Sequence, residues 1–318
     1  MKISIIIPVF NQLTYTQQMY ESLQETLPDS LDIEVLFVDD ASSDGTSAWL
    51  SSIASTTPSA HSIKSVRVLT NPVNLGYAKS NNRAARESTG DLLLLLNNDL
   101  VLKPGWLEPM LKVVNQNQSL PAIVGNLQYL PDTNILDHAG IEVRLDTESN
   151  RPVIEHIREH ISDKPKKVFA VTGACCLIAR NTFESLGGFD EQYVNGGEDV
   201  DLCMKVTQAG GSCRVVPASS VWHHVSRTRS RQVERDEKNS WRLFQLWHKQ
   251  IARELERSCA RLIADTPMED QLTKRIAEEF LEGTRSLAPI AVKAMAQKYV
   301  QTELSRWKQN FNADTRSC

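Results

Sequence analysis

The sequence predicts a doubly wound α/β fold with a mostly parallel sheet, because short apolar segments alternate with segments of helical periodicity. Four segments are mostly apolar and rich in β-branched residues or leucine, namely residues 2–10, 33–38, 66–69 and 92–96. This composition fits strands that are covered on both faces, as in a parallel sheet. Helical spacing occupies the intervals between them, at residues 14–26, 46–55 and 77–87. An open sheet of this kind binds its ligands at the carboxyl ends of its strands.

The second half of the chain has a less regular pattern. We expect a helix to begin at Pro104, where proline suits the first turn, and strands at residues 122–127 and 168–179. Residues 128–167 contain several Pro, Asp and Asn residues and predict a variable loop region. Residues 232–312 are rich in helix formers, with a few Pro and Gly interruptions, and predict about three helices.

Composition is that of an ordinary globular protein, with 318 residues, 41% hydrophobic residues and a formal net charge of −4. This length allows one large domain with an appendage. The charge is unevenly distributed, because residues 225–318 hold 18 Lys and Arg against 13 Asp and Glu, whereas residues 1–224 hold 17 against 26. The basic segment predicts one of two things. It makes peripheral contact with an anionic membrane, or it forms a solvated helical surface that docks on the acidic residues 1–224.

Several classes of protein do not fit the sequence. No apolar run approaches the roughly 20 residues that a bilayer span needs, and the N-terminal residues lack the pattern of a secretory signal. We therefore expect a cytoplasmic protein, with any membrane contact on the inner face. The six cysteines show no C-x-x-C spacing, so we expect neither a zinc site nor a disulfide framework. No nucleic-acid partner is expected.

Polar residues appear at the carboxyl ends of the predicted strands and in the segments that follow them, where such a sheet places its ligand. These positions are Pro8-Val9-Phe10-Asn11, Val38-Asp39-Asp40, Asn74-Leu75-Gly76 and Asn97-Asn98-Asp99. A carboxylate at a strand end can accept a hydrogen bond from a base or a ribose. A turn requires one such residue, and the pair of adjacent carboxylates therefore indicates a binding function rather than a turn alone.

The Asn97-Asn98-Asp99 segment follows five consecutive leucines, so a buried strand delivers polar groups to the edge of the sheet. Mg²⁺ in nucleotide sites is held by one or two carboxylates together with substrate phosphates. One carboxylate with two neighbouring carboxamides leaves coordination positions open for a diphosphate. The segment is therefore either a divalent cation site, with Mg²⁺ or Mn²⁺ as the ion, or a structural turn alone.

A second acidic cluster, Glu198-Asp199-Val200-Asp201, is preceded by two glycines. If a helix begins at Asp201 and buries Leu202, Val206 and Ala209, the two preceding acids lie at its positive N-terminal end. Helix capping is one explanation of this pattern, and the other is a carboxylate general base directed at an acceptor hydroxyl. His223 follows farther along the chain, where it is either a structural or surface residue or a neutral imidazole that completes the coordination of a metal.

The ordered series of motifs resembles the family 2 glycosyltransferases, in particular their rhamnosyltransferase-like branch. The resemblance covers about residues 3–226 and rests on I-I-I-P-V-F-N, V-D-D-A-S-S-D-G-T, N-x-x-N-L-G-Y-A, N-N-D, T-G-A-C-C-L-I-A-R, G-G-F-D and E-D-V-D-L-C. It implies a GT-A catalytic domain at residues 1–226 and a helical C-terminal extension at residues 227–318. The metal motif of the family is usually D-x-D, whereas here only Asp99 keeps a carboxylate.

The resemblance also implies roles for individual residues. Asp199 is the expected catalytic base, with Glu198 and Asp201 supporting the acceptor site. Asp99 and His223 are the expected metal ligands. The residues expected to line the nucleotide-sugar site are Pro8, Phe10, Asp39, Asp40, Asn74, Gly76, Asn81, Asn97 and Asn98.

The expected activity is inverting transfer of a hexosyl or rhamnosyl group from a nucleoside-diphosphate sugar to an acceptor hydroxyl. UDP and dTDP donors are favoured over GDP donors, and the acceptor is expected to be a glycan or a lipid-linked molecule in cell-surface polysaccharide or glycolipid assembly. A dinucleotide-binding oxidoreductase and a P-loop NTPase share the alternating pattern but require glycine-rich phosphate loops that this chain lacks. A non-catalytic nucleotide-sugar-binding subunit of a glycan-assembly complex is the remaining alternative.

Overall fold

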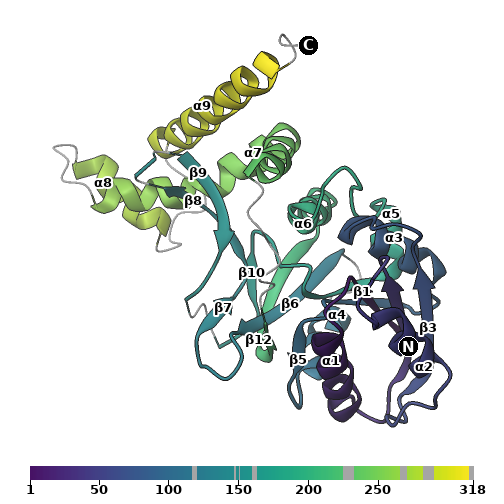
Figure 1. Ribbon diagram of the computed structural model, residues 1–318. Coiled ribbons are helices and arrows are strands. Elements are labelled where there is room, and N and C mark those ends of the chain that lie inside the picture. The colour runs from purple at the N-terminus through teal and green to yellow at the C-terminus, as the bar shows by residue number, and fades with distance from the viewer. Residues whose placement is uncertain are drawn as a thin grey trace. The chain divides into compact units, whose positions relative to one another are not determined.

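The computed structural model describes residues 1–116, 120–146, 148–149, 151–159, 163–224, 233–265, 271–281 and 290–314 (Figure 1). The chain divides into two compact units. Unit 1 comprises Met1–Ile141 and His156–Val233, and unit 2 comprises Glu142–Glu155 and Glu234–Cys318. The expected boundary between residues 226 and 227 lies outside the described residues. The division groups residues 142–155, which precede that boundary, with the C-terminal helices.

Unit 1 is built on one mixed sheet in which most strands run in the same direction. Its main strand order is β10-β12-β6-β11-β4-β1-β2-β3, while β5 pairs with β12 and β7 pairs with β6. The strands are β1 (Lys2–Val9), β2 (Asp32–Asp39), β3 (Ile63–Thr70), β4 (Leu92–Leu96), β5 (Leu100–Leu102), β6 (Ala122–Tyr129), β7 (Leu136–His138), β10 (Lys166–Val168), β11 (Cys175–Ala179) and β12 (Ser212–His223).

The N-terminal part of this sheet confirms the doubly wound prediction. β1 is parallel to both β2 and β4, and β2 is parallel to β3. β11 lies antiparallel between β4 and β6. All five leucines of β4 are buried, as a strand covered on both faces requires. The carboxyl ends of β1, β2 and β4 therefore meet at one edge of the sheet, and the predicted ligand residues follow them there.

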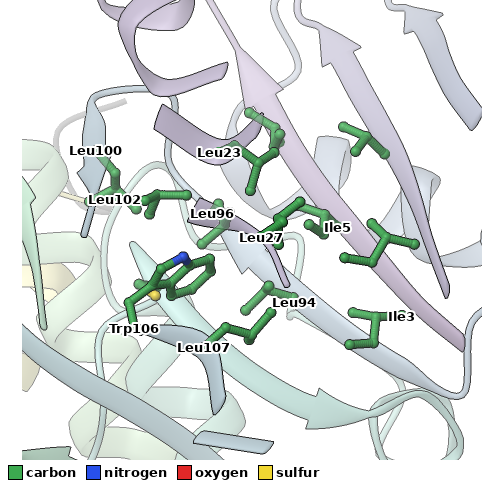
Figure 2. Packing of buried hydrophobic residues seen from close by; sticks show 14 of the residues in the cluster. Ile3, Ile5, Leu23, Leu27, Leu94, Leu96, Leu100, Leu102, Trp106 and Leu107 are labelled. Carbon is green, nitrogen blue, oxygen red and sulfur yellow. The ribbon is translucent and has the colours of Figure 1, made fainter. Parts of the chain in front are cut away.

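Helices cover both faces of this sheet. They are α1 (Leu13–Thr26), α2 (Thr46–Ala54), α3 (Tyr77–Glu87), α4 (Leu107–Gln116), α5 (Arg180–Ser185) and α6 (Glu198–Gln208). Side chains of α1, α2 and α4 form one buried cluster with alternate residues of the strands, because successive strand residues point to opposite faces. Figure 2 shows part of this cluster, where Trp106 and Leu107 lie near Leu94 and Leu96 of β4. Figure 1 draws α3, α5 and α6 on the other side of the sheet.

Three expectations about element boundaries were wrong. α4 begins at Leu107 rather than Pro104, because Gly105 has a left-handed conformation with φ of 76° that no α-helix contains. α6 begins at Glu198 rather than Asp201, directly after the left-handed Gly197. Ala209, expected on its buried face, is exposed beyond the helix end.

The region after β6 also differs from the expectation. Residues 128–167 were expected to form loops, yet they contain β7, β8 (Ile141–Asp146), β9 (Arg151–His156) and the start of β10. Residues 168–179 were expected to form one strand, but β10 ends at Val168 and β11 begins at Cys175. Between these strands, Ala170 forms an isolated bridge with Ile141, and Gly173 bonds with the side chains of Tyr77 and Asp199.

Unit 2 contains a two-stranded sheet of β8 and β9 and the helices α7 (Val233–Asp265), α8 (Gln271–Leu281) and α9 (Ile290–Asp314). Within the described residues of this unit, these helices agree with the prediction of about three. α7 is interrupted at Trp247, whose backbone is not helical. Arg151 of β9 and Arg306 of α9 both bond to the buried Glu303, so an ionic cluster joins strand and helix. Among the helices that the structure describes, none is long and apolar enough to cross a membrane.

Candidate active site

The segment after β1 forms the first part of the site. Pro8 is half-buried within the strand, and Phe10 at its end is 48% exposed. Asn11 has a left-handed backbone, which asparagine adopts more readily than most residues. Its side-chain oxygen accepts the backbone N–H of Ser43 at 2.7 Å, and its own N–H donates to Ser42 at 2.8 Å. Asn11 therefore fixes the loop that follows β2.

The two adjacent carboxylates at the end of β2 have different partners. Asp39 is 1% exposed and accepts the backbone N–H of Ser42 at 2.9 Å and the hydroxyl of Ser47. Its carboxylate thus holds the turn into α2. Asp40 is 4% exposed and accepts the backbone N–H groups of Leu75 and Gly76, both at 2.8 Å. Asp40 therefore fixes the loop before α3.

The residues expected to line the site after β3 differ in their burial. Asn74 is exposed, and Gly76 has a φ of 85° that suits glycine. Asn81 is fully buried, donates to the carbonyl of Tyr77 at 2.9 Å, and has a side-chain oxygen without a partner among the described residues. Asn71 was not predicted, yet its amide donates to Asp40 at 2.7 Å. Its position directly after β3 was the signal that the sequence offered.

The segment after β4 brings Asp99 to His223. Asn97 donates its backbone N–H to Ala174 at 2.8 Å, and the side chain of Asn98 donates to Thr16 of α1 at 2.9 Å. These contacts hold the turn in place. Asp99 is 5% exposed, and its Oδ1 lies 3.3 Å from Nε2 of His223 at the end of β12.

The Asp99 and His223 pair suits a divalent cation. A carboxylate oxygen and an imidazole nitrogen both offer lone pairs, and they approach each other where the strands end. The other ring nitrogen of His223 is buried without a hydrogen-bond partner among the described residues. No group of three or more His, Cys, Asp or Glu residues in the described part of the chain is arranged to hold a metal ion. Such a cation would therefore need further ligands from a substrate, as diphosphates supply in nucleotide sites.

The acidic cluster lies in the first turn of α6. Asp199 is half-buried, and its Oδ1 and Oδ2 accept the backbone N–H groups of Val200 at 2.8 Å and Gly173 at 3.0 Å. Glu198 is 5% exposed and accepts the N–H of Gly196 at 2.6 Å. Asp201 is fully buried and pairs with Lys205 at 2.9 Å.

These contacts suggest different uses for the three acids. Two N–H donors at the start of the helix fix the direction of the Asp199 carboxyl group, which remains partly open to solvent. Asp201 forms an ion pair within its own helix, and Glu198 closes the glycine turn before it. Asp199 is therefore the acid of this cluster that is best placed to meet an incoming hydroxyl.

Tyr77, at the start of α3, is a further residue that was not predicted as part of the site. Its hydroxyl donates to the carbonyl of Gly173 at 2.7 Å, and its N–H donates to Asn195 at 3.1 Å. Burial is the main cause that raises the pKa of Tyr77 well above 10, and the nearby charge of Asp199 adds to it. Nothing in the sequence predicted this contact, because Tyr77 and Gly173 are far apart in the chain.

The residues that the sequence singled out thus lie at the carboxyl ends of β1, β2, β4 and β12 and at the starts of α3 and α6. Hydrogen bonds or ion pairs within the chain engage many of their side chains, namely those of Asp39, Asp40, Asn81, Asn98, Glu198, Asp199 and Asp201. Their expected contacts with substrates stay predictions, as do those of the other site residues.

Comparison with known sequences identifies the class to which this fold and site belong. Residues 4–187 match the family described as glycosyl transferase family 2, and residues 140–278 match glycosyl transferase family group 2. The chain belongs to glycosyl transferase family 2.

Three relatives illustrate the range of this similarity. Over 72% of this chain, the sequence is 30% identical to an uncharacterized protein of Sinorhizobium fredii. Over 48% of the chain, it is 32% identical to the O-antigen biosynthesis protein RfbC of Myxococcus xanthus. Over 63% of the chain, it is 26% identical to an N-acetylglucosaminyl-diphospho-decaprenol L-rhamnosyltransferase of Mycobacterium tuberculosis. The aligned regions cover 25%, 12% and 69% of those relatives. The chain therefore spans a quarter or less of the first two.

Solved structures share the fold. GalNAc-T7, crystallised with UDP, GalNAc and Mn²⁺, superimposes with a TM-score of 0.64 at 18% identity, covering 88% of this chain and 54% of that one. The mannosyltransferase PcManGT of Pyrobaculum calidifontis, in complex with GDP-Man and Mn²⁺, gives 0.53 at 18% identity, covering 96% and 74%. Unit 1 thus has the GT-A fold that the sequence predicted.

Proposed function

We propose that this chain is an inverting, cation-assisted glycosyltransferase that moves a hexosyl or rhamnosyl group from a nucleoside-diphosphate sugar to an acceptor hydroxyl. The observation that carries the proposal is the approach of Asp99 to His223 within 3.3 Å at the carboxyl edge of the sheet. This edge is where an open α/β sheet binds nucleotides. Membership of the family supports the transfer reaction itself.

The proposed mechanism assigns separate tasks to the two ends of the site. Asp99 and His223 would hold Mg²⁺ or Mn²⁺, which when bound neutralises charge on the departing nucleoside diphosphate. Asp199 accepts the proton of the acceptor hydroxyl while that oxygen bonds to the anomeric carbon. The bond from the anomeric carbon to the phosphate oxygen breaks, and its electron pair leaves with the diphosphate. A single displacement from the opposite face inverts the anomeric configuration.

The donor and acceptor are proposed at the level of chemical class. We propose a UDP or dTDP donor ahead of a GDP donor, with the nucleotide beside Pro8, Phe10 and Asp40. A glycan or lipid-linked acceptor is supported by the relatives named for O-antigen biosynthesis and for rhamnosyl transfer to a decaprenol-linked sugar. We further propose that the catalytic domain covers residues 1–226 and that the basic segment after it contacts an anionic membrane surface peripherally.

Thermal unfolding with nucleoside diphosphates tests the proposal. UDP, dTDP and GDP are each added with Mg²⁺, with Mn²⁺ or with a chelator. A ligand at 100 times its Kd stabilises the folded state by about 2.7 kcal/mol, so at least one nucleotide should raise the unfolding temperature when the cation is present. Asp99→Ala should remove the part of the shift that depends on the cation.

The matched control is Asp29→Ala, because Asp29 is exposed and precedes the amino end of β2, whereas the candidate site follows the carboxyl ends of the strands. It should keep the full shift. If no nucleotide stabilises the wild-type protein, or if Asp99→Ala keeps the cation-dependent shift, the proposed site is wrong.

A further inference from the structure

Residues 173 and 174 lie at a point where three parts of the candidate site meet. The carbonyl of Gly173 accepts the hydroxyl of Tyr77 at 2.7 Å, and its N–H donates to Asp199 Oδ2 at 3.0 Å. The next carbonyl, that of Ala174, accepts the N–H of Asn97 at 2.8 Å. The start of α3, the segment after β4 and the first turn of α6 are therefore joined through two residues of backbone.

Tyr77 is held rigidly at this junction. Its ring packs against Phe189 with a centroid separation of 5.6 Å, and its N–H donates to Asn195 at 3.1 Å. The preceding residue, Gly76, donates its N–H to Asp40 at 2.8 Å. The position of the Tyr77 hydroxyl is thus fixed from the side of the candidate nucleotide site.

The contact between Tyr77 and Gly173 leaves no room for a side chain at residue 173. A Cβ atom there would lie 2.8 Å from the Tyr77 hydroxyl oxygen and 3.2 Å from two carbons of its ring. Because the ring is confined by its own packing, the close approach depends on glycine at this position. The hydroxyl remains protonated at ordinary pH, so it donates to the carbonyl throughout the working range.

We propose that Tyr77 is a positioning residue for the catalytic base, acting through Gly173 to aim Oδ2 of Asp199. This inference rests on the proposed function, because it gives Asp199 the role of base. Tyr77 itself touches neither the donor nor the acceptor in this proposal. Its hydroxyl holds the Gly173 carbonyl, and the adjacent N–H holds one oxygen of the carboxylate. The other oxygen is fixed by Val200 at 2.8 Å, so both oxygens have a set direction.

The test is Tyr77→Phe, which removes the hydroxyl and keeps the ring. Release of nucleoside diphosphate from the nucleotide sugar is followed with the acceptor, or with water in its place. We expect kcat to fall about 10- to 100-fold, since small displacements of a reacting group reduce rates on this scale. The KM for the nucleotide sugar and the binding of UDP with Mn²⁺ should stay within about threefold of the wild type.

Tyr20→Phe is the matched control. Tyr20 is buried, and it packs in the cluster around α1, against Phe37 and Trp49, rather than beside Gly173. It should retain the wild-type kcat. Equal losses of kcat in both variants, or a loss in Tyr77→Phe that appears in KM alone, would overturn the proposal in favour of a structural role.

Gly173→Ala tests the contact between Tyr77 and Gly173 by changing its second partner. The added methyl group meets the Tyr77 hydroxyl, so kcat should fall in the wild-type background. In the Tyr77→Phe background the nearest atom is gone, and the further loss should be smaller, as expected for coupled sites. Fully additive losses would contradict the proposed path.

The outcomes separate the inference from the function on which it rests. A wild-type protein that binds and cleaves no nucleotide sugar would defeat the proposed function. A wild-type protein that turns over normally, with an equally active Tyr77→Phe variant, would defeat only the positioning role.

Discussion

Glu34 in unit 1 and Glu303 in unit 2 are buried to the same extent, with side chains that are each 3% exposed, but different groups hold their charges. Glu34 accepts the N–H of Thr89 at 2.6 Å and the hydroxyl of Ser4 at 2.5 Å, while the ammonium of Lys2 lies 3.5 Å away. Mostly neutral dipoles therefore stabilise this carboxylate. It links β2 to β1 and to the segment before β4.

Glu303 is held by two guanidinium groups instead. Arg151 donates to it at 3.0 and 2.7 Å, and Arg306 donates at 3.1 and 2.7 Å. Burial alone would raise the pKa of Glu303, but the bonds from the two arginines outweigh it and hold the pKa below 4.5. Burial likewise opposes the bonds from Ser4 and Thr89 that lower the pKa of Glu34.

The difference shows two ways in which the chain stabilises a buried carboxylate. In unit 1, backbone N–H groups also hold Asp40 and Asp199, and such dipoles stabilise a carboxylate without cancelling its charge. In unit 2, the arginines cancel the charge of Glu303 and join β9 to α9. Glu34 and Glu303 both join elements of structure, whereas the proposal above gives Asp199 a catalytic task.

The largest expected effect tests whether a charge held by N–H groups serves chemistry. Asp199→Asn keeps an oxygen for the N–H of Gly173 but cannot accept the proton of an acceptor hydroxyl. Because general base assistance contributes about 10²- to 10⁴-fold, transfer should fall by that factor while nucleotide binding is retained. Steady-state kinetics with the nucleotide sugar measure the loss.

Glu87→Gln is the control for this change from carboxylate to amide. Glu87 is 53% exposed and pairs with Arg67 on the surface. Its activity should match the wild type. Near-normal transfer by Asp199→Asn would remove Asp199 as the base and leave the acids of unit 1 with a structural role.

The next effect concerns the ionic cluster of unit 2. Glu303→Gln leaves two guanidinium groups facing an amide. Loss of one partner from a buried pair costs roughly 3 to 5 kcal/mol, and we expect about 2 kcal/mol here because Arg151 is 42% and Arg306 is 28% exposed. Hydrogen exchange in α9 should accelerate accordingly, since local opening follows local stability.

Glu279→Gln provides the surface counterpart, because Glu279 is 38% exposed and pairs with Arg275 within α8. Exchange in α8 should change little, as exposed pairs contribute about 0 to 1 kcal/mol. Unchanged exchange of α9 in Glu303→Gln would mean that the cluster does not hold α9 to β9.

The smallest effect is expected for Glu34→Gln, the matched substitution in unit 1. The amide oxygen can still accept from Thr89, and the hydroxyl of Ser4 can turn to accept from the new amide. The free energy of unfolding should fall by about 1 kcal/mol, within the range for single hydrogen bonds. Denaturant unfolding measures it. A loss larger than that of Glu303→Gln would reverse the comparison between the units.

Much of the site could be predicted from short stretches of sequence. The five leucines of β4 and the β-branched run of β1 indicated buried parallel strands, and parallel strands bring their carboxyl ends to one edge. That rule was enough to select Asp40 and Asp99. The first turn of α6 was likewise indicated by its acids and glycines, although its start was misplaced by three residues.

Other features depended on contacts between distant residues. Residues 128–167 gave no clear alternation, so the strands within them were missed, and the pairing of β7 with β6 exists only through the fold. The role of Asn11 in fixing Ser43, and that of Asn71 in binding Asp40, required loops from different strand ends to meet. The secondary-structure propensity of a short segment carries no information on contacts between distant loops.

The sequence by itself determined the alternating architecture, the strand ends that carry polar groups and the family to which they point, because periodicity and local residue chemistry suffice for these. The tertiary structure decided which groups of the chain hold each acid. It also decided that Tyr77 reaches Gly173 beside Asp199, across 96 residues of sequence. The physical reason is that a hydrogen bond depends on position and direction in space, and the fold brings its two partners together from separate elements.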